Sequence, residues 1–192
     1  MFIQTESTPN PNTLKFLPGR DVLGLGATRD FAHAEAAEAS PLAAAIFAVD
    51  GVTRVYLGAD FASVTKTADA DWAWLKPFVL GAIMEHFVAG RPVLLDASQP
   101  EAAMHDDTVY EGEAAEIVEQ IKALIDTRVR PAVAQDGGDI AFHSWEHEAG
   151  LVRLHMRGAC AGCPSSTMTL KQGIENMLRH YVPEVRAVEQ VI

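Results

Sequence analysis

The chain has 192 residues, of which 48% are hydrophobic and 21% charged, a composition typical of a soluble globular protein with one ordinary domain or two small ones. The formal net charge of -11 argues against a DNA or RNA partner, which would need a clustered basic surface. No apolar run approaches the roughly 20 residues that span a bilayer, and the start lacks the pattern of a signal peptide, so we expect no membrane partner and a reducing compartment.

The first half of the chain alternates between strand and helix signals. Ser40 has the character of an N-cap, with a proline at the first helical position, and Asp71 can cap a second helix. Trp72 and Trp74, at the start of that second helix, are expected to be core residues. The expected elements are strands at 2–5 and 13–17, a helix at 41–49, strands at 52–57 and 61–66, and a helix at 72–90.

An acidic segment separates the two halves. Residues 96–113 hold six acidic side chains and no Lys or Arg, so they cannot bury much surface and are predicted to form a flexible linker. The predicted organisation is a domain at 1–95, the linker at 96–113 and a second domain at 114–192.

The second half predicts a small mixed domain of its own. A helix from Ile117 ends before Pro131, a glycine turn follows, and two alternating strands are joined by a hairpin loop. The chain as a whole is therefore expected to be an α+β protein of two small domains. The expected elements after the helix are strands at 139–145 and 151–157, a helix from Pro164 to Tyr181 and a last strand at 185–191.

The only two cysteines, Cys160 and Cys163, lie three positions apart in the loop before the helix at Pro164. A helix N-terminus favours thiolate over thiol, and thiolates are what iron and zinc bind. An all-cysteine cluster or zinc site takes four ligands, and one chain supplies two. Two chains related by a twofold axis could share one centre at a small, exposed interface.

Three other interpretations compete with a shared metal centre. A Cys-x-x-Cys at a helix N-terminus also suits a thioredoxin-like redox protein, although here it follows a hairpin without an evident βαβ unit; on spacing alone the two are about even. Zinc completed by His143, His147 or His155 is less expected than solvated histidines. Two buried structural cysteines are disfavoured because the Gly and Ala neighbours offer no bulky apolar cover.

Several motifs resemble the Nfu family of iron-sulfur cluster proteins. The second half resembles the NifU-like C-terminal domain through Arg130-Pro131, residues 136–139 (DGGD), residues 158–166 (GACAGCPSS) and residues 181–185 (YVPEV). The first half resembles the Nfu N-terminal domain through residues 8–11 (TPNP), 14–16 (LKF), 40–43 (SPLA) and 74–77 (WLKP).

The resemblance implies a non-enzymatic scaffold or carrier. It implies a [4Fe-4S] cluster bound by Cys160 and Cys163 of each subunit in a homodimer, received from or assembled with an upstream scaffold and transferred to apo iron-sulfur proteins of the lipoyl synthase type. A [2Fe-2S] centre would take the same four thiolates. A bacterial cytosol is the simpler location and a processed mitochondrial matrix form the alternative. Gly137, Gly138 and Gly158, with Gly162, are expected to set backbone shape.

Overall fold

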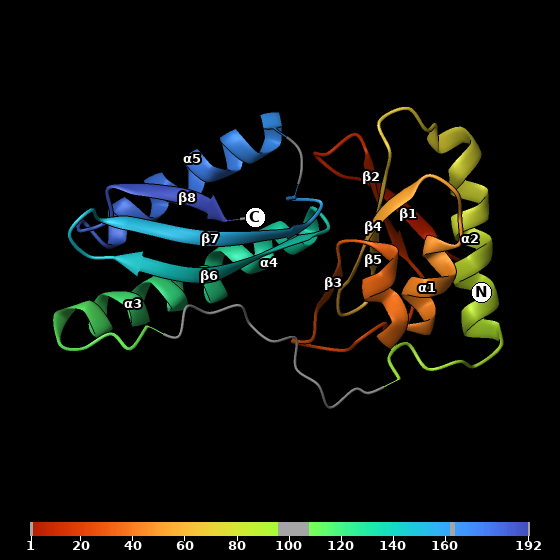
Figure 1. Cartoon of the computed structure of the whole chain (residues 1–192), viewed down its shortest axis with the longest axis horizontal. Helices are drawn as coiled ribbons and strands as arrows, with labels where there is room; N and C mark the ends of the chain where they lie inside the picture. The colour runs from red at the N-terminus through yellow and green to blue at the C-terminus, as the bar shows by residue number, and fades with distance from the viewer. Residues whose placement is uncertain (1, 96–107, 162–163, 192) are drawn as a thin grey trace. The chain divides into compact units, whose positions relative to one another are not determined.

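The computed structural model describes residues 2–95, 108–161 and 164–191, and it contains two compact units, Met1–Glu101 and Ala102–Ile192 (Figure 1). Each unit combines helices with a sheet, which confirms the α+β class. The boundary between the units falls within residues 96–107, outside the described residues, so the linker there stays a prediction. Among the described helices none is long and apolar enough to cross a membrane.

The N-terminal unit is an antiparallel five-stranded sheet with helices packed against it. The strand order is β1-β2-β5-β4-β3. The predicted elements are confirmed with small shifts of their ends, whereas β3 and η1 were not predicted. The elements are β1 (Gln4–Ser7), β2 (Thr13–Leu17), β3 (Arg29–Phe31), the 3₁₀ helix η1 (Ala34–Ala39), α1 (Pro41–Phe47), β4 (Val52–Leu57), β5 (Ala62–Lys66) and α2 (Trp72–Val88).

Two capping side chains start the helices of this unit, as the sequence predicts. The hydroxyl of Ser40 accepts a hydrogen bond from the backbone N–H of Ala43 at 3.1 Å and donates one to the carbonyl of Val93 at 2.7 Å. The carboxylate of Asp71 accepts from the N–H of Ala73 at 2.9 Å. Each cap satisfies a backbone donor that has no partner inside the helix, which fixes where α1 and α2 begin.

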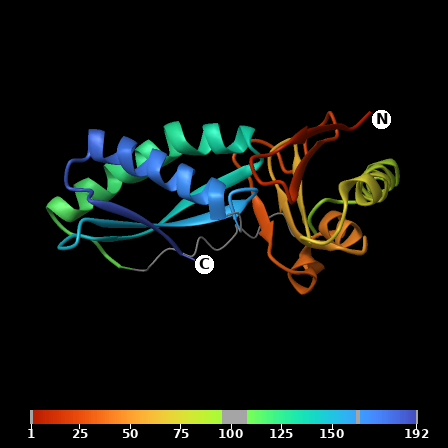
Figure 2. The same cartoon turned by 90° about the horizontal axis from the view of Figure 1, so that it is seen from above.

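The C-terminal unit is a three-stranded sheet in the order β6-β7-β8. Strand β6 is antiparallel to β7, and β8 is parallel to β7. Figure 2 shows the helices of this unit on the same side of its sheet. The elements are α3 (Glu113–Leu124), the π-helical turn η2 (Ile125–Val129), α4 (Arg130–Gln135), β6 (Gly138–Glu146), β7 (Leu151–Gly158), α5 (Pro164–Tyr181) and β8 (Ala187–Val191).

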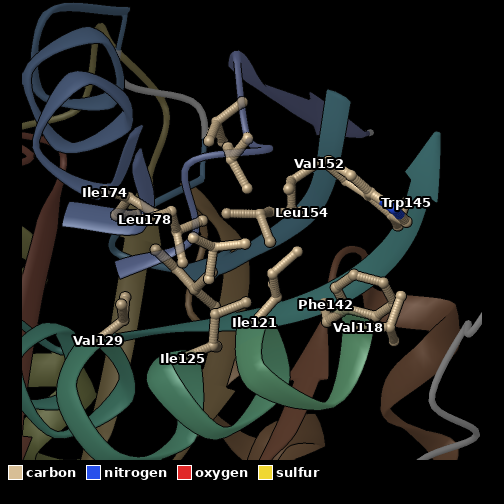
Figure 3. Close-up of a cluster of buried hydrophobic side chains, with 14 of the residues drawn as sticks. Val118, Ile121, Ile125, Val129, Phe142, Trp145, Val152, Leu154, Ile174 and Leu178 are labelled. Atoms are coloured by element: carbon tan, nitrogen blue, oxygen red, sulfur yellow. The ribbon is translucent and has the colours of Figure 1, made fainter. Parts of the chain in front are cut away.

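One apolar core lies between these helices and the sheet. Figure 3 shows Ile121 and Ile125 from the first helical segment pointing towards Leu154 of β7, with Ile174 and Leu178 of α5 beside them. All five side chains are buried. Each helix therefore buries an apolar stripe against the inner face of the sheet, as the helical spacing of these residues requires.

The structure corrects two expectations in this unit. The helical segment does not end before Pro131, because a π-helical turn joins α3 to α4 and places Pro131 at the start of α4. The predicted linker also ends too late. Tyr110 packs against the core and its hydroxyl accepts a hydrogen bond from the N–H of Trp145 at 2.8 Å, and Glu113 already opens α3.

Candidate metal centre

Cys160 lies in a tight turn immediately after β7, where the sequence places it. The strand ends at Gly158, whose φ of +59° is readily adopted only by glycine. The N–H of Cys160 donates to the carbonyl of Arg157 at 3.2 Å, and the N–H of Ala161 donates to Gly158 at 3.1 Å. The turn thus folds the chain back at the cysteine and holds its backbone.

Gly137 and Gly138, where β6 begins, lie against this turn. Gly137 has a φ of +77°, and its carbonyl accepts a hydrogen bond from the N–H of Ala159 at 3.1 Å. Gly138 pairs with Gly158 in the sheet. A Cβ at Gly138 would overlap the Sγ of Cys160, so glycine leaves room for the thiol in its observed position. The expected role in backbone shape is confirmed for Gly137 and Gly158, whereas Gly138 makes the space that the sulfur occupies.

The thiol of Cys160 is buried, which corrects two expectations. The residue is 6% exposed and belongs to the apolar core of the unit, so it has the cover that its Gly and Ala neighbours in sequence do not suggest. Burial, with smaller contributions from the charges of Asp136 and Asp139, raises the pKa of Cys160 to about 12. A lowered pKa at a helix N-terminus was predicted, whereas burial of the thiol shifts the pKa of Cys160 upwards.

An ion pair lies next to the cysteine turn, at the start of β6. Asp139, next to Gly138 in β6, is buried and its two carboxylate oxygens accept hydrogen bonds from Nε and Nη2 of Arg130 at 2.8 and 3.1 Å. Arg130 also donates to Asp126 at 3.3 Å, and these carboxylates raise the guanidinium pKa. Such a bidentate pair fixes orientation as well as charge. It ties α4 to the start of the strand on which the thiol packs.

Cys163, the second predicted ligand, and Gly162 lie outside the described residues. The next described element, α5, begins at Pro164 and leads to β8, which is parallel to β7. The cysteine loop therefore joins β7 to α5 in a βαβ unit. The expectation that this context is absent is wrong, because β8 returns beside β7 rather than extending the hairpin.

The histidines weighed as zinc ligands are only partly brought together. The rings of His143 and His155, on neighbouring strands, lie 4.7 Å apart between centroids in an edge-to-face arrangement. His147 instead stacks edge-on to Trp145 at 6.2 Å. Among the described residues no group of three or more His, Cys, Asp and Glu side chains could hold a metal ion. The pairing of His143 with His155 depends on the strand register, which the spacing of His143 and His147 did not reveal.

The site thus offers a sulfur donor on a turn shaped by glycines. Cys160 occupies a space that Gly138 leaves open, and Cys163 follows three residues later in the sequence. Soft thiolate donors select iron-sulfur clusters, zinc and copper(I). Two cysteines at this spacing are donors that a thiolate-ligated metal centre could use, and such a centre would need further ligands to complete it.

Comparison with known proteins identifies the family. Residues 3–90 match the model of the scaffold protein Nfu/NifU N-terminal domain, and residues 121–189 match the NifU-like domain. The chain is 50% identical over 190 residues to NifU-like protein 4, mitochondrial, and 52% identical over 190 residues to NifU-like protein 5, mitochondrial, both from Arabidopsis thaliana. It is 53% identical over 191 residues to the NFU1 iron-sulfur cluster scaffold homolog, mitochondrial, from Drosophila simulans.

These alignments cover 99%, 99% and 100% of this chain and 66%, 68% and 65% of the three relatives, respectively, so the chain spans about two thirds of their length. The chain belongs to the Nfu/NifU-like family of iron-sulfur cluster scaffold proteins. The resemblance in the sequence motifs is thereby confirmed over both halves. Nothing in the comparisons supports the thioredoxin-like alternative.

Proposed function

We propose that the protein carries a [4Fe-4S] cluster as cargo, held by Cys160 and Cys163 of two copies, and transfers it to apo iron-sulfur proteins. The observation that carries this proposal is the ligand count: the chain has two cysteines, and a cluster of this type takes four thiolates. Family membership supplies the iron-sulfur chemistry. The cluster type, the dimer and the direction of transfer are part of the proposal.

The surroundings of Cys160 fit this cargo. The turn after β7 fixes the cysteine backbone by two hydrogen bonds, and Gly137 ties it to the start of β6. Because Gly138 has no side chain, the sulfur of Cys160 can occupy the space where a Cβ at position 138 would lie. Since iron displaces the thiol proton on binding, the buried sulfur can serve as a ligand once the metal is present. We propose no bond-making step by the protein other than ligand exchange, so it acts as a carrier rather than an enzyme.

The burial of Cys160 also weighs against the redox alternative. A thioredoxin-like protein needs an attacking thiol that ionises near neutral pH. Burial raises the pKa of Cys160 instead. The βαβ context, which favours a redox motif, is therefore outweighed by the state of the described thiol.

The proposed clients are apo proteins that take a [4Fe-4S] cluster, of the lipoyl synthase type, and the proposed source is an upstream assembly scaffold. The relatives named above are mitochondrial proteins by name. Their location supports the mitochondrial matrix as the site of action, and the comparisons give no support to the bacterial cytosol expected from the sequence.

Anaerobic reconstitution with iron and sulfide tests the proposal. The expected product absorbs in the visible range, holds one cluster per two chains and runs as a dimer, and Cys160→Ser or Cys163→Ser abolishes it. His155→Gln is the matched control and should bind a full cluster. A colourless protein that reduces insulin disulfides, or a cysteine variant that still holds a full cluster, would contradict the model.

A further inference from the structure

One side of α2 presents a largely apolar surface to solvent. Trp74 and Val88 are each 76% exposed, Phe78 is 65% exposed and Met84 42%. At 3.6 residues per turn these positions, with the exposed Pro77 and Gly81 between them, fall on one side of the helix. We call this set of six residues the α2 stripe. Trp74 was expected in the core, and its exposure corrects that prediction.

The opposite side of α2 is apolar too. Leu75, Val79 and Ile83 are buried in the N-terminal unit. The helix has 17 residues, and its titratable side chains are Lys76, Glu85 and His86. A helix that is apolar all round is normally covered on all sides, whereas the described part of this chain covers one side. A large exposed apolar patch marks an interaction surface.

Gly81 lies at the centre of the α2 stripe. Glycine inside a helix costs about 1 kcal/mol relative to alanine. No positive φ requires it, and an added Cβ would meet no described atom within 4 Å. Neither backbone conformation nor packing within the described residues accounts for a glycine here. A missing side chain at the middle of an exposed helix face does allow a second helix to approach closely.

The α2 stripe is self-complementary about Gly81. In an antiparallel pair of α2 helices with a twofold axis at Gly81, Trp74 of one copy faces Val88 of the other and Phe78 faces Met84. Each large aromatic side chain then meets a smaller or more adaptable one. We propose that the α2 stripe binds the α2 stripe of a second copy of this chain, in an isologous interface.

The one charged side chain on this side of the helix is compatible with such a pair. Glu85 forms an ion pair with Arg91 at 3.7 Å. It lies four residues from the twofold axis, so at 1.5 Å per residue the two copies of Glu85 are about 12 Å apart along the helices. This exceeds the screening length of about 8 Å at physiological salt, and their repulsion is small.

The size of the stripe sets the strength of the contact. Aromatic side chains bury 150–250 Å² each, so the exposed parts of the four large side chains amount to roughly 500 Å² per copy. A pair would bury about 1,000 Å², the lower limit for a specific interface. The contact is weak by itself. It would raise the local concentration of the two C-terminal units, which the four-cysteine site needs to bring together.

The oligomeric state of the full chain without iron tests this interface. The double variant Cys160→Ser, Cys163→Ser removes the cluster ligands, so any dimer that remains is independent of the proposed function. Sedimentation across the micromolar range should show a reversible monomer–dimer equilibrium. Phe78→Glu in this background should weaken it at least tenfold. Phe2→Glu, which changes another exposed phenylalanine of the same unit (79% exposed), should leave it unchanged.

Gly81→Ala separates an interface from a structural role. It should raise the melting temperature, since alanine favours the helix, and at the same time weaken the dimer, because the added methyl groups meet at the axis. A mere structural role would change stability without changing association. A chain that stays monomeric throughout, or a dimer that Phe78→Glu does not weaken, overturns the proposal. So does a monomer that binds a different protein through the stripe.

Cross-linking locates the axis. Helices 8–10 Å apart whose Cα atoms lie 2.3 Å from each axis bring the two facing Cα atoms to about 3.5–5.5 Å, which overlaps the 4.4–6.8 Å of a disulfide. Gly81→Cys in the double-variant background should therefore form an intermolecular disulfide under mild oxidation. Ala89→Cys, about 24 Å from its copy along the helices, should not. Equal cross-linking at both positions would refute the proposed axis.

Discussion

Replacing Gly138 by alanine tests the geometry of the cysteine turn most directly. The added Cβ would overlap the Sγ of Cys160 and lie 3.0 Å from both the carbonyl oxygen of Arg157 and the amide nitrogen of Cys160. The sulfur can rotate away, but the two backbone atoms belong to the turn that ends β7. Relief therefore requires the turn to move relative to the start of β6.

The size of the effect follows from these contacts. Forcing an extra carbon into a close-packed interior costs typically 1–3 kcal/mol. We expect Gly138→Ala to lower the free energy of unfolding of the C-terminal unit by about 2 kcal/mol, which changes the ratio of folded to unfolded protein about 30-fold. The shifted turn should also reduce the iron and sulfide bound on reconstitution.

Urea unfolding followed by the fluorescence of the buried Trp145 measures this loss, in a background where Trp72 and Trp74 are phenylalanine. Gly173→Ala is the matched control, because Gly173 is an exposed residue of α5 with no described atom within 4 Å of an added Cβ. It should stabilise the same unit by about 0.5–1 kcal/mol. If Gly138→Ala proves as stable as the parent and binds a full cluster, the argument from the overlap is refuted.

Three further predictions concern the rest of the fold. Arg130→Met should destabilise the C-terminal unit by about 2–3 kcal/mol in urea unfolding, because it leaves the buried carboxylate of Asp139 without its main partner; a loss below 1 kcal/mol would contradict this role. Burial lowers the pKa of His86, so the folded state binds fewer protons than the unfolded one, and stability of the N-terminal unit should be full above pH 6.5 and fall below it; His86→Leu should flatten this dependence in thermal melts at several pH values. Ser40→Ala should cost about 1–2 kcal/mol of the same unit's stability in chemical unfolding, since it removes the cap of α1 and the bond to Val93, and an unchanged midpoint would refute this.

Local signals were sufficient to predict most elements of the fold. Ser40 and Asp71 mark helix starts by capping chemistry that needs no tertiary context. The helix end predicted before Pro131 was wrong because it was inferred from a local preference alone. A proline disfavours the helical conformation of the residue before it, yet a π-helical turn that depends on packing carries the helix across it. The short strand β3 was missed because it has three residues and no period to detect.

The candidate site was predictable in its chemistry but not in its surroundings. The sequence alone shows that Cys160 and Cys163 are the two cysteines of the chain, so the number of thiolate ligands that one chain can supply was predictable. The burial of Cys160 depends on core residues far away in the chain, and its raised pKa follows from that burial. The contact of Gly138 with the sulfur requires the register of β6 on β7. Gly137 and Gly138, adjacent in the sequence, indicated a turn, but they did not indicate the contact with the sulfur.

The exposure of Trp74 is a feature that the sequence of one chain did not predict. Its position in a helix that is apolar on every side predicts burial, and that prediction fails for the described chain. The proposed second copy on the α2 stripe would account for both facts, because both sides of α2 would then be buried. The proposed assembly would also supply the second pair of cysteines. The ligand set and the cover of α2 are two features that one chain leaves incomplete, and the proposed twofold partner would complete both.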